Sequence, residues 1–104
     1  MSLKHITGQL DDLRYFIKND AKTGGDLYNA FKSYSDLVLE NWPDGLSDRG
    51  NWKREMEFVL EKIKGKRAVV QLKRSSDLLS FKNDALEVIH HFNSEFIMFS
   101  NGKE

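Results

Sequence analysis

The sequence predicts an all-α protein, a small antiparallel bundle of four main helices that forms a single domain over residues 1–104. Two observations support this fold class. Apolar residues recur at spacings of three and four in four separate segments, as they do on the buried side of a helix. Stretches that contain glycine or the only proline separate these segments. With 39% hydrophobic and 12% aromatic residues, the chain can bury one core.

The first helix is predicted between Leu3 and Asn19. A helix turns by about 100° per residue, so the recurring apolar residues share one side of it. The segment KTGGD, from Lys22 to Asp26, then breaks the pattern. The apolar side consists of Leu3, Ile6, Leu10, Leu13 and Ile17.

The second helix is predicted between Asp26 and Trp42. Asp26 is the expected N-cap, because an aspartate side chain accepts hydrogen bonds from free backbone N–H groups at a helix start. Pro43 disfavours the helical conformation of the residue before it, so the helix should end near Asn41 or Trp42. The apolar stripe consists of Leu27, Phe31, Tyr34, Val38 and Trp42.

The third helix is predicted to begin near Asn51, which is expected to cap it, and Gly65 leaves three outcomes open. Gly65 ends the helix as a left-handed C-cap, or the helix continues because Val70 returns to the phase of Ile63, or residues 67–72 form a short strand. A lone strand has no partner, so we expect a helix with a kink or break near Gly65; a break gives a fifth short helix. The apolar stripe consists of Trp52, Met56, Val59, Leu60 and Ile63.

The fourth helix is predicted between Ser76 and Phe99, followed by a polar tail from about residue 100. Its apolar residues cover about half of the circumference, so we expect it to be the central element of the bundle. Residues 96–99 are all apolar, and Met98 should point away from the core. Either the neighbouring corner covers this end, or it forms an oligomer contact, in which case the chain is a homodimer.

The segment NWPDGLSDRGNW, Asn41 to Trp52, is interpreted as a corner between the second and third helices. Its PDG sequence is typical of a turn. Trp42 ends one apolar stripe and Trp52 begins the next, so the two indoles should lie near each other and close one end of the bundle. The alternative is a ligand site, since loops often carry function.

Several chemistries lack their sequence signatures. The chain has no cysteine, which excludes disulfides, thiolate catalysis and cysteine-bound zinc. A calcium loop from Asp44 to Glu55 would lack one oxygen ligand and the turn glycine. His90 and His91 diverge by about 100° on a helix, and the Glu-x-x-His spacing at Glu87 occurs once, whereas a di-iron site needs two copies. We therefore expect a non-catalytic protein without metal or cofactor.

The expected location is the cytoplasm. The apolar runs are short, so no membrane segment is predicted, and the N-terminus lacks the apolar core of a signal peptide. The 16 basic and 16 acidic residues cancel, whereas nucleic-acid-binding proteins usually show a basic excess.

A basic cluster between Lys62 and Arg74 is the main functional signal, because six basic residues occur there without an acidic one. It is either a solvated face balanced by Asp36 and Glu40, a contact for an acidic protein, or a contact for phosphates. The predicted partner-binding residues are Lys66, Arg67, Lys73 and Arg74, with Trp42 and Trp52 as aromatic anchors if exposed.

These observations favour a non-catalytic protein–protein interaction module, such as a small bacterial or phage-type accessory protein, regulator or inhibitor. Its partner is an unidentified protein, and an acidic one would suit the basic cluster. The alternative is a nucleic-acid-binding regulator that uses the basic cluster, residues 62–74. A bundle that binds a small ligand or a metal near Glu87 and His90 is the third hypothesis.

Overall fold

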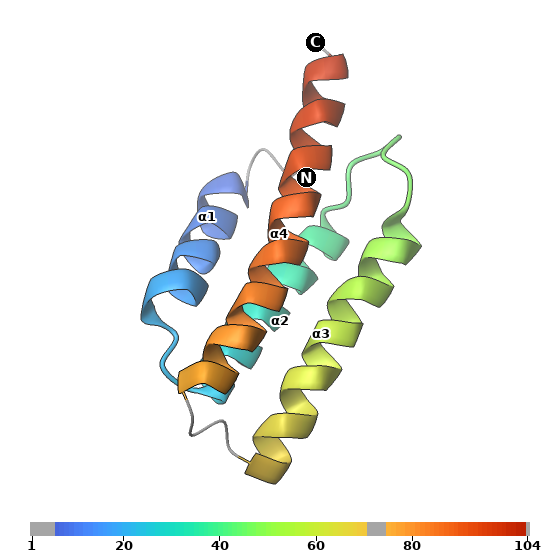
Figure 1. The fold of residues 1–104 in the computed structure, drawn as a ribbon. Coiled ribbons are helices and arrows are strands. Elements are labelled where there is room, and N and C mark those ends of the chain that lie inside the picture. The colour runs from blue at the N-terminus through green and yellow to red at the C-terminus, as the bar shows by residue number, and fades with distance from the viewer. Residues whose placement is uncertain (1–5, 71–74, 104) are drawn as a thin grey trace.

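The structure, a computed structural model, describes the backbone of residues 6–70 and 75–103, and the side chains of residues 6–65 and 78–99. Four helices follow one another in antiparallel order and pack into a bundle (Figure 1). Within the described residues there is no strand. The all-α fold class is therefore confirmed. The elements are α1 (Thr7–Tyr15), the π-helical turn η2 (Phe16–Asp20), α2 (Gly24–Glu40), α3 (Arg49–Val70) and α4 (Ser75–Lys103).

The first predicted helix is present, but its end is a π-helical turn. The backbone N–H of Ala21 donates to the carbonyl of Phe16 at 2.8 Å, which closes the wider i to i+5 turn. This turn places Ile17 and Ala21 in the core, where both are fully buried. The sequence pattern cannot distinguish a π turn from another turn of α-helix, since both keep apolar residues on one side.

The start of α2 corrects the prediction that Asp26 is the N-cap. Thr23 holds that position with an extended backbone, and its hydroxyl oxygen accepts the backbone N–H of Asp26 at 3.1 Å. Asp26 lies in the first turn, where its carboxylate accepts the backbone N–H of Lys22 at 3.2 Å. The side chains of Thr23 and Asp26 therefore each accept a hydrogen bond from a backbone N–H at the start of the helix, an arrangement similar to a capping box.

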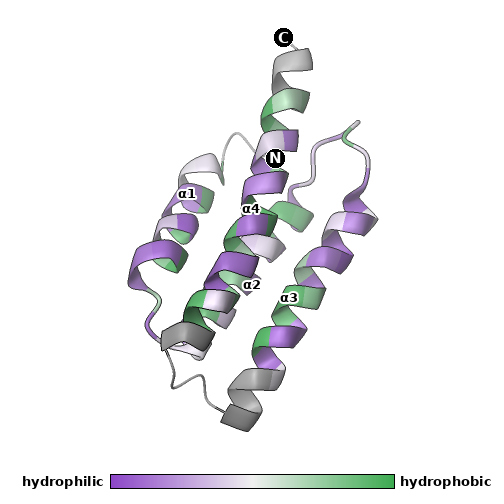
Figure 2. Cartoon of the chain, viewed as in Figure 1, coloured by the Kyte–Doolittle hydropathy of each residue, from purple (hydrophilic) through white to green (hydrophobic). Residues whose placement is uncertain are grey.

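Helix α2 carries the largest share of the core. It contacts α1, η2, α3 and α4, whereas the sequence predicts α4 as the central element. α4 packs against α2, α3 and η2, but its long apolar arc leaves Leu79 exposed. Figure 2 shows that hydrophobic and hydrophilic residues alternate along each helix. The buried residues of α2 are Gly24, Leu27, Ala30, Phe31, Tyr34, Ser35 and Val38.

The segment after α2 is a structural corner, and both tryptophans pack on one phenylalanine of α4. The ring centroids of Trp42 and Trp52 lie 5.7 and 5.8 Å from that of Phe92. The indole N–H of Trp42 donates to the backbone carbonyl of Leu46 at 2.8 Å. The indoles meet at this end of the bundle through Phe92, and Leu46 is half-buried beneath the corner.

Backbone conformation and an arginine complete the corner. Gly45 and Asp48 adopt positive φ angles of 90° and 70°, which a β-branched residue would rarely accept. The Arg49 guanidinium donates to the carbonyl of Leu39 at 3.1 and 3.3 Å and so satisfies an orphan carbonyl at the end of α2. α3 begins at Arg49, two residues before the cap predicted at Asn51.

The C-terminal end of α4 extends beyond the other helices (Figure 1). The helix continues to Lys103, so the predicted polar tail from about residue 100 is helical. Met98 is 73% exposed, as its position off the apolar stripe predicts, and Ile97 is 52% exposed. Phe96 stacks on Phe92 with a centroid distance of 6.2 Å.

Across the residues that the structure describes, no helix has the length and apolar character needed to cross a membrane.

Helix α3 passes through Gly65 without a break and ends at Val70. Of the three outcomes left open by the sequence, the continuous helix is correct for residues 66–70; residues 71 and 72 lie outside the described part.

A Cβ atom added at Gly65 would meet nothing within 4 Å. We therefore expect Gly65→Ala to stabilise the protein by about 0.5–1 kcal/mol, because alanine has the higher helix propensity. Urea denaturation measures the change, and the matched variant Gly45→Ala, at a positive φ, should destabilise. A loss of stability in Gly65→Ala would indicate a left-handed cap.

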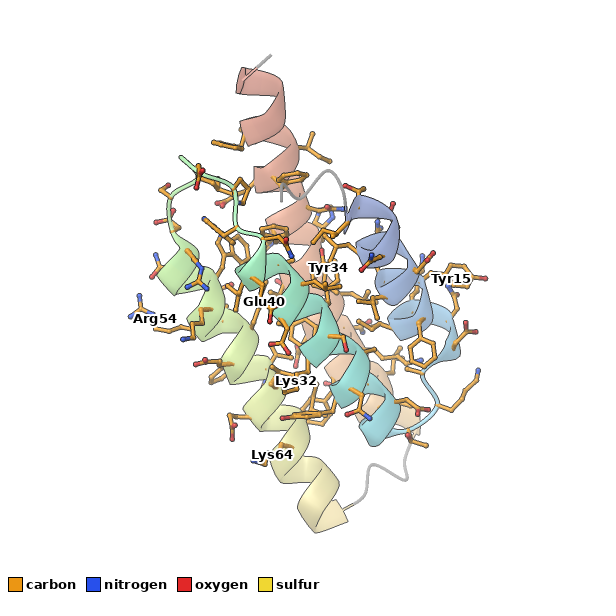
Figure 3. The ribbon with its side chains drawn as sticks, turned by 180° about the vertical axis from the view of Figure 1, so that it is seen from behind. Tyr15, Lys32, Tyr34, Glu40, Arg54 and Lys64 are labelled. Carbon is orange, nitrogen blue, oxygen red and sulfur yellow. The ribbon has the colours of Figure 1, made fainter. Side chains whose placement is uncertain are left out.

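Burial raises the pKa of Tyr34, and the Arg14 guanidinium opposes that effect. The phenol of an unfolded chain loses its proton near pH 10, whereas the folded phenol keeps it. The stabilisation is complete below about pH 10 and decreases above it by about 1.4 kcal/mol per pH unit. We expect the free energy of unfolding to fall less steeply with rising pH in Tyr34→Phe than in wild type. The control is Tyr15→Phe, whose ring is 64% exposed and points away from the bundle (Figure 3). Equal slopes for wild type and Tyr34→Phe would contradict the prediction.

Candidate interaction face

Two polar contacts join α3 to α4. Lys62 Nζ lies 3.1 Å from Asp84 Oδ2, and the Trp52 indole N–H donates to Glu95 Oε2 at 2.9 Å. Because the helices are antiparallel, the contact nearer the end of α3 is the one nearer the start of α4. The two contacts therefore set the register of the pair, and the stretches of α3 and α4 between them lie side by side.

A shallow apolar groove lies between these contacts. It has a volume of about 310 Å³ and is open to solvent. Val59 forms part of the core, Val88 is half-buried and Phe58 is 66% exposed. We call this surface the α3–α4 face. It is lined by Arg54, Glu55, Phe58, Val59 and Val88.

Phe58 is the unusual residue of the α3–α4 face. Lys62 Nζ lies 5.3 Å from the centre of its ring, within range of a cation–π interaction. The same ammonium group contacts Asp84, so one cation serves both the ring and the carboxylate. This arrangement holds Lys62 over one side of the ring and leaves most of the ring in contact with water. A single exposed aromatic residue is unremarkable by itself, but here it borders a groove.

The acidic residues of α4 differ from the sequence interpretation. Their spacing in the sequence predicts that Asp84, Glu87, His91 and Glu95 form a solvated helix face with weak i, i+4 pairs. Asp84 is half-buried and Glu95 is exposed, yet both also contact α3. They lie on the flank of α4 next to the buried stripe, and a helical wheel of one helix does not show which flank meets a neighbour. Glu87 and His91 are exposed, as predicted. Asp36, expected to balance the basic cluster, pairs with Lys32 at 3.0 Å.

Of the predicted partner-binding residues, the structure describes the side chains of Trp42 and Trp52. The backbone of Lys66 and Arg67 belongs to α3, but their side chains lie outside the described residues, as do Lys73 and Arg74 altogether. Trp52 is only 8% exposed, so it offers little surface to a partner. Trp42 is half-buried, and its N–H is already used within the chain.

Phe58 was missed by the sequence reasoning, although a signal exists. The apolar stripe of α3 passes through Met56, Val59 and Ile63. Phe58 lies about 200° from Met56 around the helix, on the polar side. A large aromatic residue on the polar side of a helix is a signal for an interaction surface, but it does not belong to the apolar stripe that predicts the core.

Other surface groups form weaker candidates. A second shallow groove of about 360 Å³ lies on one side of α1 and η2. It carries charges of both signs, and every lining residue is exposed, as on an ordinary solvated helix. Its lining is Asp11, Arg14, Tyr15, Lys18 and Asn19.

The described part of the chain offers no candidate metal site. No group of three or more His, Asp or Glu side chains there could hold a metal ion. The rings of His90 and His91 are 6.0 Å apart and tilted by 50°. No protein-family model, curated protein or solved structure matches this chain. The function is therefore inferred from the chain's own surface.

Proposed function

We propose that the chain is a non-catalytic protein–protein interaction module and that the α3–α4 face is its binding surface. The exposure of Phe58 beside an apolar groove carries the proposal. Aromatic residues are enriched at the centre of protein interfaces, where one or two of them supply most of the binding energy. Removing two-thirds of a phenylalanine side chain from water provides about 1–2 kcal/mol.

The surroundings of Phe58 also suit an interface. Arg54 and Glu55 line the groove with opposite charges, and Lys62, which pairs with Asp84, lies near the ring of Phe58. Interfaces commonly combine an apolar centre with a charged rim of this kind. The rim contributes specificity and orientation more than affinity, because exposed ion pairs stabilise by less than about 1 kcal/mol.

The proposal covers class and location as well. A small accessory protein, regulator or inhibitor, of bacterial or phage type, would use such a face to bind and modify the behaviour of another protein. The absence of cysteine fits a reducing compartment, and we propose the cytoplasm. The nucleic-acid alternative depends on the basic cluster of residues 62–74. Lys62 pairs with Asp84, and the side chains from Lys66 to Arg74 lie outside the described residues, so this alternative remains a prediction.

The test compares two exposed hydrophobic residues. Phe58 is 66% exposed on α3 and Leu79 is 58% exposed on α4. Leu79 and Val88 are nine residues apart, so they lie on opposite sides of α4. We expect nuclease-treated affinity capture with the tagged chain to lose its protein partner in Phe58→Ser and to keep it in Leu79→Ser.

Both substitutions exchange an exposed side chain, so each should change the free energy of unfolding by less than about 0.5 kcal/mol. Circular dichroism and urea denaturation check that both variants fold. Equal capture by Phe58→Ser and wild type, or equal loss in both variants, would refute the α3–α4 face as the binding surface. A loss of capture after nuclease treatment would favour the nucleic-acid alternative.

A further inference from the structure

We propose that the α3–α4 face binds a second copy of this chain, with the two α3 helices antiparallel about a two-fold axis next to Phe58. The inference rests on the proposed function, because it names the partner of the same face. Three features support it: an aromatic residue beside a groove, a pair of opposite charges that is complementary to itself, and a formal net charge of zero for the whole sequence.

The aromatic residue and the groove lie on one face of one chain. A two-fold interface brings the same patch of both copies together, so the patch must be complementary to itself. Phe58 projects beside the groove that it helps to line. A two-fold rotation places each Phe58 ring against the groove of the other copy. The groove volume of about 310 Å³ is larger than the roughly 150 Å³ cavity that accepts a benzene ring.

Two of the charges that flank Phe58 match under the same rotation. Arg54 lies one turn before Phe58 and Glu61 lies one turn after it, and both are exposed. At 100° per residue, these three side chains share a 60° arc of α3. Arg54 points outward from α3 (Figure 3), and its guanidinium donates to the Asn51 side chain. An antiparallel partner helix brings Arg54 of each copy opposite Glu61 of the other.

A parallel arrangement of the two helices would fail by the same reasoning. It would place Arg54 against Arg54 and Glu61 against Glu61, and like charges in contact disfavour association. The charge pattern therefore selects the antiparallel arrangement. Lys62 does not disturb it, because its ammonium group is held by Asp84 and by the Phe58 ring.

The overall charge permits self-association. The 16 basic and 16 acidic residues of the chain give a formal net charge of zero, so two copies do not repel each other at long range. From Arg54 to Glu61 the contact spans about two turns of α3. Such a contact is small, and small interfaces are weak and reversible. The dimer should therefore appear in the upper part of a series from micromolar to millimolar concentration.

The experiment is sedimentation equilibrium over that series with the full chain. Wild type should dimerise, Phe58→Asp should remain monomeric, and Leu79→Asp should dimerise as wild type does. Arg54→Glu and Glu61→Arg should each weaken dimerisation by at least about tenfold, because each creates two like-charge contacts. The double variant Arg54→Glu/Glu61→Arg should recover it, since the pairs form again with their charges exchanged.

One control separates the contact from the change in net charge. Lys53→Glu changes the charge as Arg54→Glu does, but Lys53 lies 100° further around α3 and should dimerise within about threefold of wild type, since a distant surface charge acts weakly. A wild type that remains monomeric at millimolar concentration overturns the proposal. A double variant that dimerises more weakly than both single variants also overturns it. If wild type is monomeric while capture still depends on Phe58, the proposed function stands and only self-association fails. If neither dimerisation nor capture depends on Phe58, both the self-association proposal and the proposed function fail.

Discussion

The packing of three aromatic rings around Phe92 is the interaction on which the rest of the structure depends. Trp42 from the corner and Trp52 from α3 contact this ring of α4, and Phe96 stacks on it. Phe92 is 1% exposed, so its aromatic contacts form in the absence of water. Aromatic pairs of this kind contribute about 0.5–1.5 kcal/mol each beyond the burial of their area. One side chain thus joins the end of α2, the start of α3 and the middle of α4.

The position of the α3–α4 face follows from that packing. Trp52 reaches Phe92 with its ring and Glu95 with its N–H, which fixes the start of α3 against α4. Lys62 and Asp84 fix the pair again further along. With the register set at two places, the buried stripe of α3 meets the core. The side of α3 that carries Phe58 then turns to solvent beside Val88. The exposed ring is a consequence of a register that other residues determine.

The sequence predicts much of the fold because the fold depends on local rules. Helical periodicity places Leu27, Phe31 and Tyr34 in the core of α2, and all three are buried. Pro43 marks the end of α2 within a few residues. Helix starts were less accurate, because Thr23 and Asp26 both have the chemistry of a cap and only the backbone conformation distinguishes them. The sequence predicts α4 as the central element, whereas α2 contacts all the other helical elements, because the width of an apolar arc does not reveal which neighbours are present.

The candidate site was less predictable for a different reason. The charges of Lys66 and Arg67 are visible in the sequence, whereas the significance of Phe58 depends on a groove formed by a second helix. Val88 and Phe58 are thirty positions apart. Nothing local shows that they line one surface. The contacts of Asp84 and Glu95 with α3 have the same origin, because they depend on the register between two helices.

The most direct test of the α3–α4 face is a dilution series of the isotope-labelled chain followed by backbone amide chemical shifts. The face predicts concentration-dependent shifts that gather at residues 54–62 of α3 and around Val88 of α4, with small changes elsewhere. Shifts that gather at Ile97 and Met98, or around Tyr15, would contradict it. Spectra that remain constant up to millimolar concentration would contradict self-association through this face.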